Sequence, residues 1–209
     1  GGFPQIAEGL DGKTWLKTNR NLFVLDKGDS VFRDYTKIQT EFDQASTRFL
    51  TLTKDVDHNI FLTTNTSNAV WRFNGERFER EKWVESEDSK GKNIAIIDRT
   101  ADGAFWTMLI EPNTGALQLA SYKEESWNTV SLPADYPLNG ITDVMKDKEG
   151  NVWISSTNSG VLKLKPSGEI SRFNTENGFP VNNVSTVLED VEGNIWAGTL
   201  GSGIVGIPN

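Results

Sequence analysis

The chain repeats one pattern of residues five times, and this repeat constrains its fold more than any other feature. The segment DVEGNIWAGTLGSG at 190–203 restates DKEGNVWISSTNSG at 147–160. Weaker copies share the same skeleton around an aromatic anchor, and successive anchors stand 43 to 47 residues apart. The five anchors are Trp15, Phe61, Trp106, Trp153 and Trp196. A period in this range is typical of propellers and related repeat folds, in which each copy forms one small supersecondary unit.

Four further columns of the repeat agree in all five copies. Four residues before the anchor stands an acid: Asp11, Asp57, Asp102, Glu149 and Glu192. The following position holds Gly12, His58, Gly103, Gly150 and Gly193. Nine residues before the anchor stand the aliphatic residues Ile6, Leu52, Ile97, Val144 and Val187. Twelve residues before it stand the apolar residues Phe3, Phe49, Ile94, Ile141 and Val184.

These columns predict a β-hairpin in each copy. The aliphatic residues frame a first strand, and the acid–glycine pair predicts a tight turn, because glycine adopts positive φ without steric cost. The anchor opens a second strand, a polar loop leads to a third, and most copies add a fourth, such as 169–173. We therefore predict an all-β fold, a β-propeller of about five four-stranded blades with a last blade that is three-stranded. A sandwich or barrel is the alternative, but neither requires the same columns to recur.

The repeat boundaries are expected at 1–44, 45–90, 91–137, 138–180 and 181–209, within a single propeller domain over 1–209. The last copy ends after its third strand, and the N-terminus offers no spare strand to complete it. We expect a closed five-bladed ring, because an open arc would leave apolar blade faces in water. The alternatives are a larger ring with further blades and a homodimer that pairs two arcs.

The last two copies resemble a known repeat family. The segments ITDVMKDKEGNVWISSTNSGVLKL at 141–164 and NGFPVNNVSTVLEDVEGNIWAGTLGSGIVGI at 177–207 are similar to the two-component regulator propeller repeats. This resemblance implies a sensor region that is periplasmic or extracellular in a bacterium, with any signal sequence outside this chain. The blade pattern also has a distant resemblance to streptogramin lyases, whose activity implies histidine and a metal.

Composition argues against several partners. The chain has 209 residues, a formal net charge of −8 and no cysteine. The negative charge disfavours a role in neutralising nucleic-acid phosphates. No apolar stretch approaches the roughly 18 residues of a membrane-spanning helix. We therefore expect no nucleic-acid partner, no membrane insertion in this segment and no thiol chemistry.

The single histidine, His58, occupies the turn column in which the other four copies have glycine. Histidine is among the non-glycine residues enriched at positive φ, so we predict a turn residue rather than a general base or metal ligand. The segment DVDHN at 55–59 resembles the start of a calcium loop, but Ile60 and Thr66 replace the glycine and glutamate that such a loop requires. The sequence thus predicts no catalytic residue, no cofactor and no metal.

The tryptophans are predicted to pack. The anchors Trp15, Trp106, Trp153 and Trp196 are expected in the core between blades, since Phe61 replaces tryptophan in the same column. For the three tryptophans outside the anchor column, packing on outer strands is expected, and an exposed aromatic platform is the alternative. These three are Trp71, Trp83 and Trp127.

The loops between second and third strands are polar and differ between copies, which is typical of binding loops on a rigid scaffold. The candidate binding residues on these loops are Arg20, Asn65, Glu111, Asn113, Asn158 and Ser202. We predict a non-enzymatic extracytoplasmic sensor or interaction domain that binds a small ligand, a glycan or a protein partner on a propeller face. The alternatives are a propeller-fold lyase or hydrolase, and a structural assembly module of a longer protein.

Overall fold

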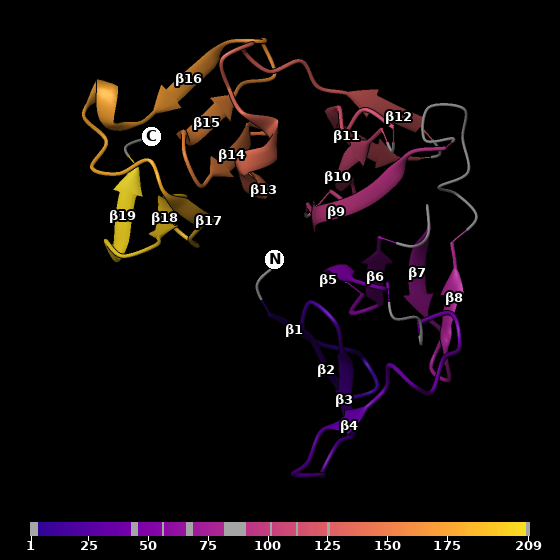
Figure 1. The fold of residues 1–209 in the computed structure, drawn as a ribbon. Helices are drawn as coiled ribbons and strands as arrows, with labels where there is room; N and C mark the ends of the chain where they lie inside the picture. Colours follow the sequence, from indigo (N-terminus) through magenta and orange to yellow (C-terminus); the bar gives the residue numbers. More distant parts are fainter. Residues whose placement is uncertain are drawn as a thin grey trace. The chain divides into compact units, whose positions relative to one another are not determined.

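The computed structural model describes residues 4–42, 46–55, 57–65, 69–81, 91–100, 102–111, 113–124 and 126–207. The chain divides into two compact units, which are described separately. The first unit comprises 1–99 and 103–129, and the second comprises 100–102 and 130–209. Figure 1 shows the strands gathered into five separate antiparallel sheets, each made from one stretch of chain.

The first unit contains three four-stranded sheets, here called blades 1 to 3. Blade 1 is formed by β1 (Gln5–Glu8), β2 (Thr14–Lys17), β3 (Leu22–Leu25) and β4 (Arg33–Asp34). Blade 2 is formed by β5 (Phe49–Lys54), β6 (Ile60–Thr64), β7 (Val70–Phe73) and β8 (Phe78–Arg80). Blade 3 is formed by β9 (Asn93–Arg99), β10 (Phe105–Ile110), β11 (Leu117–Lys123) and β12 (Ser126–Thr129).

The second unit contains blades 4 and 5. Blade 4 is formed by β13 (Ile141–Lys146), β14 (Val152–Ser156), β15 (Gly160–Leu164) and β16 (Ile170–Phe173). Blade 5 has three strands, β17 (Val184–Glu189), β18 (Ile195–Thr199) and β19 (Ile204–Ile207). The described helices are the short 3₁₀ segments η2 (Leu138–Gly140) and η3 (Thr175–Asn177). In the part of the chain that the structure describes, no helix is long and apolar enough to cross a membrane.

In every blade, strands adjacent in sequence are adjacent in the sheet. The chain is therefore an all-β propeller with five blades, of which the last is three-stranded, as the repeat predicted. Closure of the ring stays a prediction.

The predicted hairpin turns are confirmed. Gly12, Gly103, Gly150 and Gly193 have φ of 75°, 87°, 87° and 90°, in the region that side chains disfavour. His58 occupies the equivalent turn of blade 2 with φ 59°. The prediction that His58 replaces a turn glycine is therefore confirmed.

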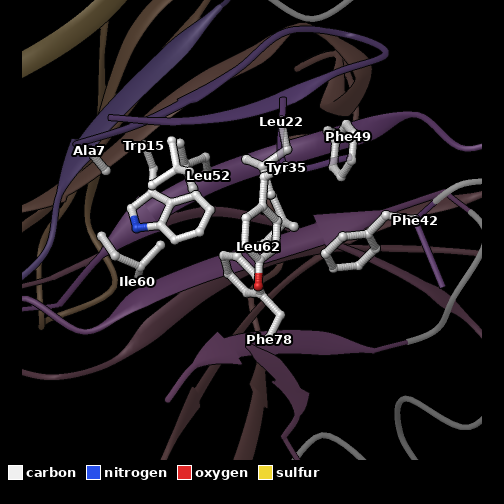
Figure 2. Close-up of a cluster of buried hydrophobic side chains, with 11 residues drawn as sticks. Ala7, Trp15, Leu22, Tyr35, Phe42, Phe49, Leu52, Ile60, Leu62 and Phe78 are labelled. Atoms are coloured by element: carbon white, nitrogen blue, oxygen red, sulfur yellow. The ribbon is translucent and has the colours of Figure 1, made fainter. Parts of the chain in front are cut away.

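An aromatic cluster fills the space between blades 1 and 2 (Figure 2). Trp15 is 0% exposed, and its ring meets the edges of Tyr35, Phe73 and Phe78 with centroids 4.8, 4.7 and 5.0 Å apart. Edge-to-face pairs of this kind stabilise a core beyond the burial of their area. The cluster fixes the two blades against each other and so positions the turns at their edges.

The predicted burial of the anchors is confirmed for four blades and wrong for the fifth. Trp15, Phe61, Trp106 and Trp153 are buried, but Trp196 is 38% exposed. The anchor of blade 4 packs against residues of β17 and β18 in blade 5. Blade 5 is the last blade of its unit, so within the described residues of that unit no further sheet covers its anchor.

The prediction of packing is confirmed for two of the remaining tryptophans. Trp71 packs on Phe42 with centroids 5.4 Å apart, and Trp127 packs on Tyr122 at 5.0 Å. Trp83 lies outside the described residues.

Candidate functional site

An aspartate six residues before the anchor holds the hairpin turn in blade 4. Asp147 Oδ1 accepts a hydrogen bond from the backbone N–H of Asn151 at 2.8 Å. Its Oδ2 accepts from Asn151 Nδ2 at 2.8 Å and from Trp153 Nε1 at 2.7 Å. Burial opposes the ionisation of Asp147, but these hydrogen bonds outweigh it and lower the pKa of the carboxyl. The carboxylate thus joins the turn to the anchor indole.

Blade 5 repeats this arrangement. Asp190 Oδ1 accepts from the backbone N–H of Asn194 at 2.8 Å, and its Oδ2 accepts from Asn194 Nδ2 at 2.9 Å and Trp196 Nε1 at 2.8 Å. The bonds from the indole and the amide lower the pKa of Asp190 to about 2. The sequence pattern did not predict this column, because the acid in the predicted turn is the one beside the glycine.

Blade 2 keeps the aspartate but changes its partner. Asp55 accepts from the backbone and side-chain nitrogens of Asn59, both at 2.8 Å. The side chain of its anchor, Phe61, has no N–H to donate. Arg99 Nη1 instead lies 2.7 Å from Asp55 Oδ2, and the guanidinium sits 4.9 Å from the ring centroid of Phe105. An ion pair thus replaces the indole bond.

Blade 1 departs from the pattern, since Gly9 stands where blades 2, 4 and 5 have aspartate, and Lys13 stands where they have asparagine. The buried indole N–H of Trp15 has no hydrogen-bond partner among the described residues. The same holds for Trp106 in blade 3, where Thr100 takes the aspartate position. Two anchors therefore lack the carboxylate acceptor.

A pocket of about 440 Å³ lies at the turn edges of blades 1 and 2. Its walls are residues 9–11 of the β1–β2 turn, residues 58–60 at the β5–β6 turn, and residues 72–75 at the end of β7. Ile60 and Phe73 give it apolar surface, and Leu10, 83% exposed, stands at its margin. The pocket is therefore built from two blades that the aromatic cluster holds together.

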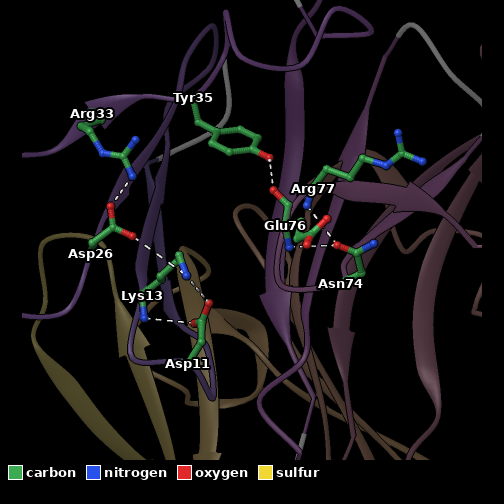
Figure 3. Close-up of polar contacts among 8 residues, drawn as sticks. All are labelled: Asp11, Lys13, Asp26, Arg33, Tyr35, Asn74, Glu76 and Arg77. Atoms are coloured by element: carbon green, nitrogen blue, oxygen red, sulfur yellow. Dashed lines mark hydrogen bonds and ion pairs between the residues drawn. The ribbon is translucent and has the colours of Figure 1, made fainter.

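Charges of both signs surround the pocket (Figure 3). On blade 1, Asp11 accepts from Lys13 Nζ at 2.8 Å, and the same ammonium lies 4.0 Å from Asp26 Oδ1. Asp26 also pairs with Arg33. The acid in the pocket wall is therefore partly neutralised by a neighbouring lysine.

The wall from blade 2 is also tied down. Arg72 forms an ion pair with Glu81. Asn74 Oδ1 accepts from the backbone N–H of Glu76 at 2.9 Å and of Arg77 at 3.0 Å, which fixes the β7–β8 turn. Figure 3 shows the Tyr35 hydroxyl donating to the backbone carbonyl of Glu76, at 3.2 Å, across the two blades.

His58 lines the same pocket from the β5–β6 turn. Its Nδ1 lies 3.5 Å from Lys54 Nζ. The site therefore contains one imidazole, one carboxylate, one guanidinium and two amides beside an apolar floor. Among the residues that the structure describes, no cluster of three or more His, Cys, Asp or Glu could hold a metal ion.

The six residues predicted to bind lie elsewhere, on loops between second and third strands. In an antiparallel blade, the loops between second and third strands lie at the edge opposite to the turn between first and second strands. Asn65 fastens its loop, since Oδ1 accepts from the backbone N–H of Arg48 at 2.6 Å, and Glu111 lies 3.5 Å from Lys92 Nζ. None of the six predicted residues lines the pocket, and their role in binding stays a prediction. The six are Arg20, Asn65, Glu111, Asn113, Asn158 and Ser202.

The five repeated antiparallel blades define a β-propeller assembled from related repeats. Residues 135–158 and 178–201 match the family model described as two-component regulator propeller. Blades 4 and 5 are thus similar to the two-component regulator propeller repeats, as the resemblance indicated. The comparison with curated proteins finds no significant match.

Solved structures share the fold. One is the extracellular domain of a putative hybrid two-component system of B. thetaiotaomicron, with a TM-score of 0.67 and 18% identity over 98% of this chain. Another is virginiamycin B lyase of Staphylococcus aureus, with a TM-score of 0.61 and 16% identity over 97% of this chain. The chain spans 26% of the length of the first protein and 68% of the second.

Proposed function

We propose that this chain is a non-enzymatic sensor domain, extracytoplasmic in a bacterium, that binds a small ligand in the pocket between the turn edges of blades 1 and 2. The pocket of about 440 Å³ is the observation that carries the proposal. It has the mixture of apolar surface and a few convergent polar groups that is typical of small-molecule sites. The similar propeller of B. thetaiotaomicron, the extracellular part of a sensor system, supports the localisation.

The location of the pocket suits a sensor. Its walls come from two blades, so a ligand that touches both adds contacts across their interface. Such a ligand stabilises the arrangement in which the walls fit it, and the stabilisation grows with its concentration. A glycan or a protein partner on the loops with Arg20 and Asn113 is the alternative mode of binding.

A thermal-shift screen of small metabolites tests this proposal. The diagnostic variant is Leu10→Lys, which introduces a long charged side chain at an exposed position in the pocket wall. Its matched control is Val191→Lys, because Val191 is 87% exposed and holds the equivalent position, five residues before the anchor of blade 5. We expect ligands that raise the melting temperature of the native chain and of Val191→Lys to bind Leu10→Lys at least about tenfold more weakly. Some ligands could bind Leu10→Lys as tightly as the native chain but fail to bind Arg20→Ala or Asn113→Ala. Such ligands would place the site on the loops between second and third strands.

A lyase is the second candidate, because the sole histidine of the chain lines the pocket together with Asp11. The similar virginiamycin B lyase has a catalytically inactive form in which a histidine is replaced by alanine. Under the sensor proposal, a bound ligand stays chemically unchanged in its NMR spectrum, and His58→Asn keeps the fold, since asparagine also tolerates positive φ. Consumption of the ligand by the native chain and its loss in His58→Asn would instead favour the lyase.

A further inference from the structure

We propose that the outer edge of blade 5 is a docking site for an extended segment of a partner protein. The segment adds an antiparallel strand to β19 and places an aromatic side chain beside Ile204 and the indole of Trp196. This site is built from residues of the second unit alone, whereas the pocket belongs to the first unit, so the inference goes beyond the proposed function and does not depend on it.

The four complete blades show what occupies this edge elsewhere in the chain. In each of them the third strand pairs with a fourth, and an aromatic residue lies in that fourth strand or directly after it. These residues are Tyr35, Phe78, Trp127 and Phe173. Tyr35 and Phe173 pack on the anchor indole of their own blade, with ring centroids 4.8 and 5.7 Å apart. Blade 5 has the anchor and the third strand, but its described residues include no fourth strand.

The backbone of β19 has outward-facing groups that an added strand can use. Thr199 N–H donates to Gly203 O at 3.0 Å, and bonded pairs alternate along an antiparallel ladder. Ile204 and Gly206 therefore direct their backbone N–H and C=O groups away from β18. No strand meets these groups in the part of the second unit that the structure describes. Free strand edges of this kind bind extended peptides by adding them to the sheet.

Blade 4 shows the pairing that an added strand would make. Opposite the anchor, β15 has Lys163 where β19 has its glycine, and Lys163 pairs with Ser171 of β16. Two residues earlier, β15 has Val161 where β19 begins, and Val161 pairs with Phe173. The partner segment therefore places its aromatic residue opposite Ile204.

The side chains of blade 5 leave room for that aromatic residue. In blade 4 the Lys163 ammonium lies 4.8 Å from the ring centroid of Trp153, but Gly206 has no side chain at the equivalent position. A Cβ built on Gly206 would lie 3.6 Å from Trp196 Cζ3, so the indole lies directly beside the glycine. Trp196 is 38% exposed and Ile204 is 75% exposed. Burial of this apolar surface under an aromatic ring is favourable.

The composition of β19 also differs from that of the outer strands of other blades. Solvent-exposed edges are usually protected by short strands, charges or proline. The outer strands of blades 1, 2 and 4 carry charged residues, which are Arg33, Asp34, Glu79, Arg80 and Arg172. β19 has the sequence IVGI, without charge or proline, and pairs with β18 without a bulge. It has the composition of an inner strand that a further strand covers.

A second copy of the chain fits this edge less well than a partner segment. Two β19 strands from two copies could pair with each other, but IVGI contains no aromatic residue. Such a pair would leave Trp196 without the aromatic neighbour that Trp15 and Trp153 have in their own blades. The chemistry of the edge therefore favours an extended partner segment that carries an aromatic residue.

The probe for the test is a synthetic peptide with the sequence GEISRFNT, the fourth strand of blade 4 with its flanking residues, 168–175. Its binding to the native chain is followed by the fluorescence anisotropy of a dye on the peptide. We expect saturable binding, weakened at least about tenfold in the peptide with Phe173→Ala, which removes the aromatic ring. The peptide with Ser171→Pro should lose as much, because proline removes an N–H of the predicted pairing.

Variants of the chain locate the bound peptide. Ile204→Lys puts a charge at the position that faces the aromatic ring, and Val191→Lys is the matched control. Val191 is 87% exposed in the same blade but lies in the turn between β17 and β18. We expect the peptide to bind Val191→Lys like the native chain and Ile204→Lys at least about tenfold more weakly. Saturating peptide should also slow the hydrogen exchange of the Ile204 and Gly206 amides.

Three results would overturn the inference. The first is a peptide that fails to bind the native chain, or that binds equally well with Phe173→Ala or Ser171→Pro. The second is slower amide exchange confined to blade 4, which would mean that the peptide replaces β16. The third is a dimer of the native chain in analytical ultracentrifugation that Ile204→Lys converts to a monomer, which would assign the edge to a second copy.

Discussion

The indole nitrogen of Trp153 donates a hydrogen bond of 2.7 Å to the carboxylate of Asp147, six residues earlier in the chain. This bond joins the start of the hairpin turn to the buried anchor of the second strand. The same carboxylate receives both nitrogens of Asn151, so one side chain organises the whole turn. The turn and the interface between blades are therefore stabilised together.

Replacing Asp147 should destabilise the chain. Asp147→Ala leaves the buried Trp153 indole without its acceptor and removes both bonds from Asn151, and a buried donor left unpaired costs about 1–3 kcal/mol in unfolding free energy. Urea denaturation measures the loss. The matched control is Glu149→Ala, since Glu149 is exposed and contacts Asn151 only at 3.2 Å. Equal losses in the two variants would contradict the role assigned to Asp147.

The equivalent hydrogen bond in blade 5 should make the stability of the folded chain depend on pH in the acidic range. The pKa of Asp190 is about 2, lower than the usual value of about 3.9. A carboxyl whose pKa is lower in the folded state stabilises it above the unfolded pKa, and this contribution is lost as the pH falls from about 4 to about 2. The melting temperature of the native chain should therefore exceed that of Asp190→Asn at neutral pH, and the two should converge near pH 2. A difference in melting temperature between the two proteins that stays constant as the pH falls from neutral to about 2 would contradict this prediction.

Gly150 should tolerate only residues that accept the left-handed backbone. Its φ is 87°, and a Cβ there would meet Pro166 Cγ at 3.6 Å, an ordinary contact. The strain in Gly150→Val therefore comes from the backbone and should cost about 1–3 kcal/mol. Gly150→Asn should lose less, because asparagine adopts positive φ more readily. Unfolding curves that coincide with the native curve for Gly150→Val would contradict this.

Lys17 is buried between blades 1 and 2 and donates to two backbone carbonyls, Phe49 O at 3.3 Å and Leu50 O at 2.9 Å. Burial lowers the pKa of its ammonium. Lys17→Met leaves both carbonyls without this donor and should reduce the unfolding free energy by about 1–3 kcal/mol.

Lys148→Met is the control for Lys17→Met. Lys148 also donates to two carbonyls, Asp190 O at 3.1 Å and Val191 O at 3.0 Å, but it is exposed. Water can replace its bonds, so the loss should stay within about 0.5 kcal/mol. A larger loss for Lys148→Met than for Lys17→Met would show that burial is not the deciding factor.

The features that the sequence predicted correctly depend on neighbouring residues in the chain. A turn at Gly150 follows from the conformations open to glycine, and the strand after it follows from the apolar pattern around Trp153. The exposure of Trp196 could not be predicted in this way, because its column is buried only when a further blade packs against it. The same residue type in the same local pattern therefore differs in burial between Trp153 and Trp196.

The pocket was missed for a related reason. It lies where turns about fifty residues apart in sequence come together, which the aromatic cluster around Trp15 brings about. The sequence indicates this place only by a departure from the repeat: Gly9 and Lys13 replace the aspartate and asparagine that the turns of blades 2, 4 and 5 have. The polar loops with Arg20 and Glu111 were predicted to bind instead because their sequences vary between blades, but variation alone does not distinguish a binding loop from a solvated one.

A crystal structure of the chain with the small metabolite that best raises its melting temperature tests the proposed binding site directly. We expect ligand density in the pocket between Gly9, Ile60 and Phe73. Density confined to the loop edge of the blades, beside Arg20, Asn65 or Glu111, with the pocket at Gly9 free of ligand, would contradict it.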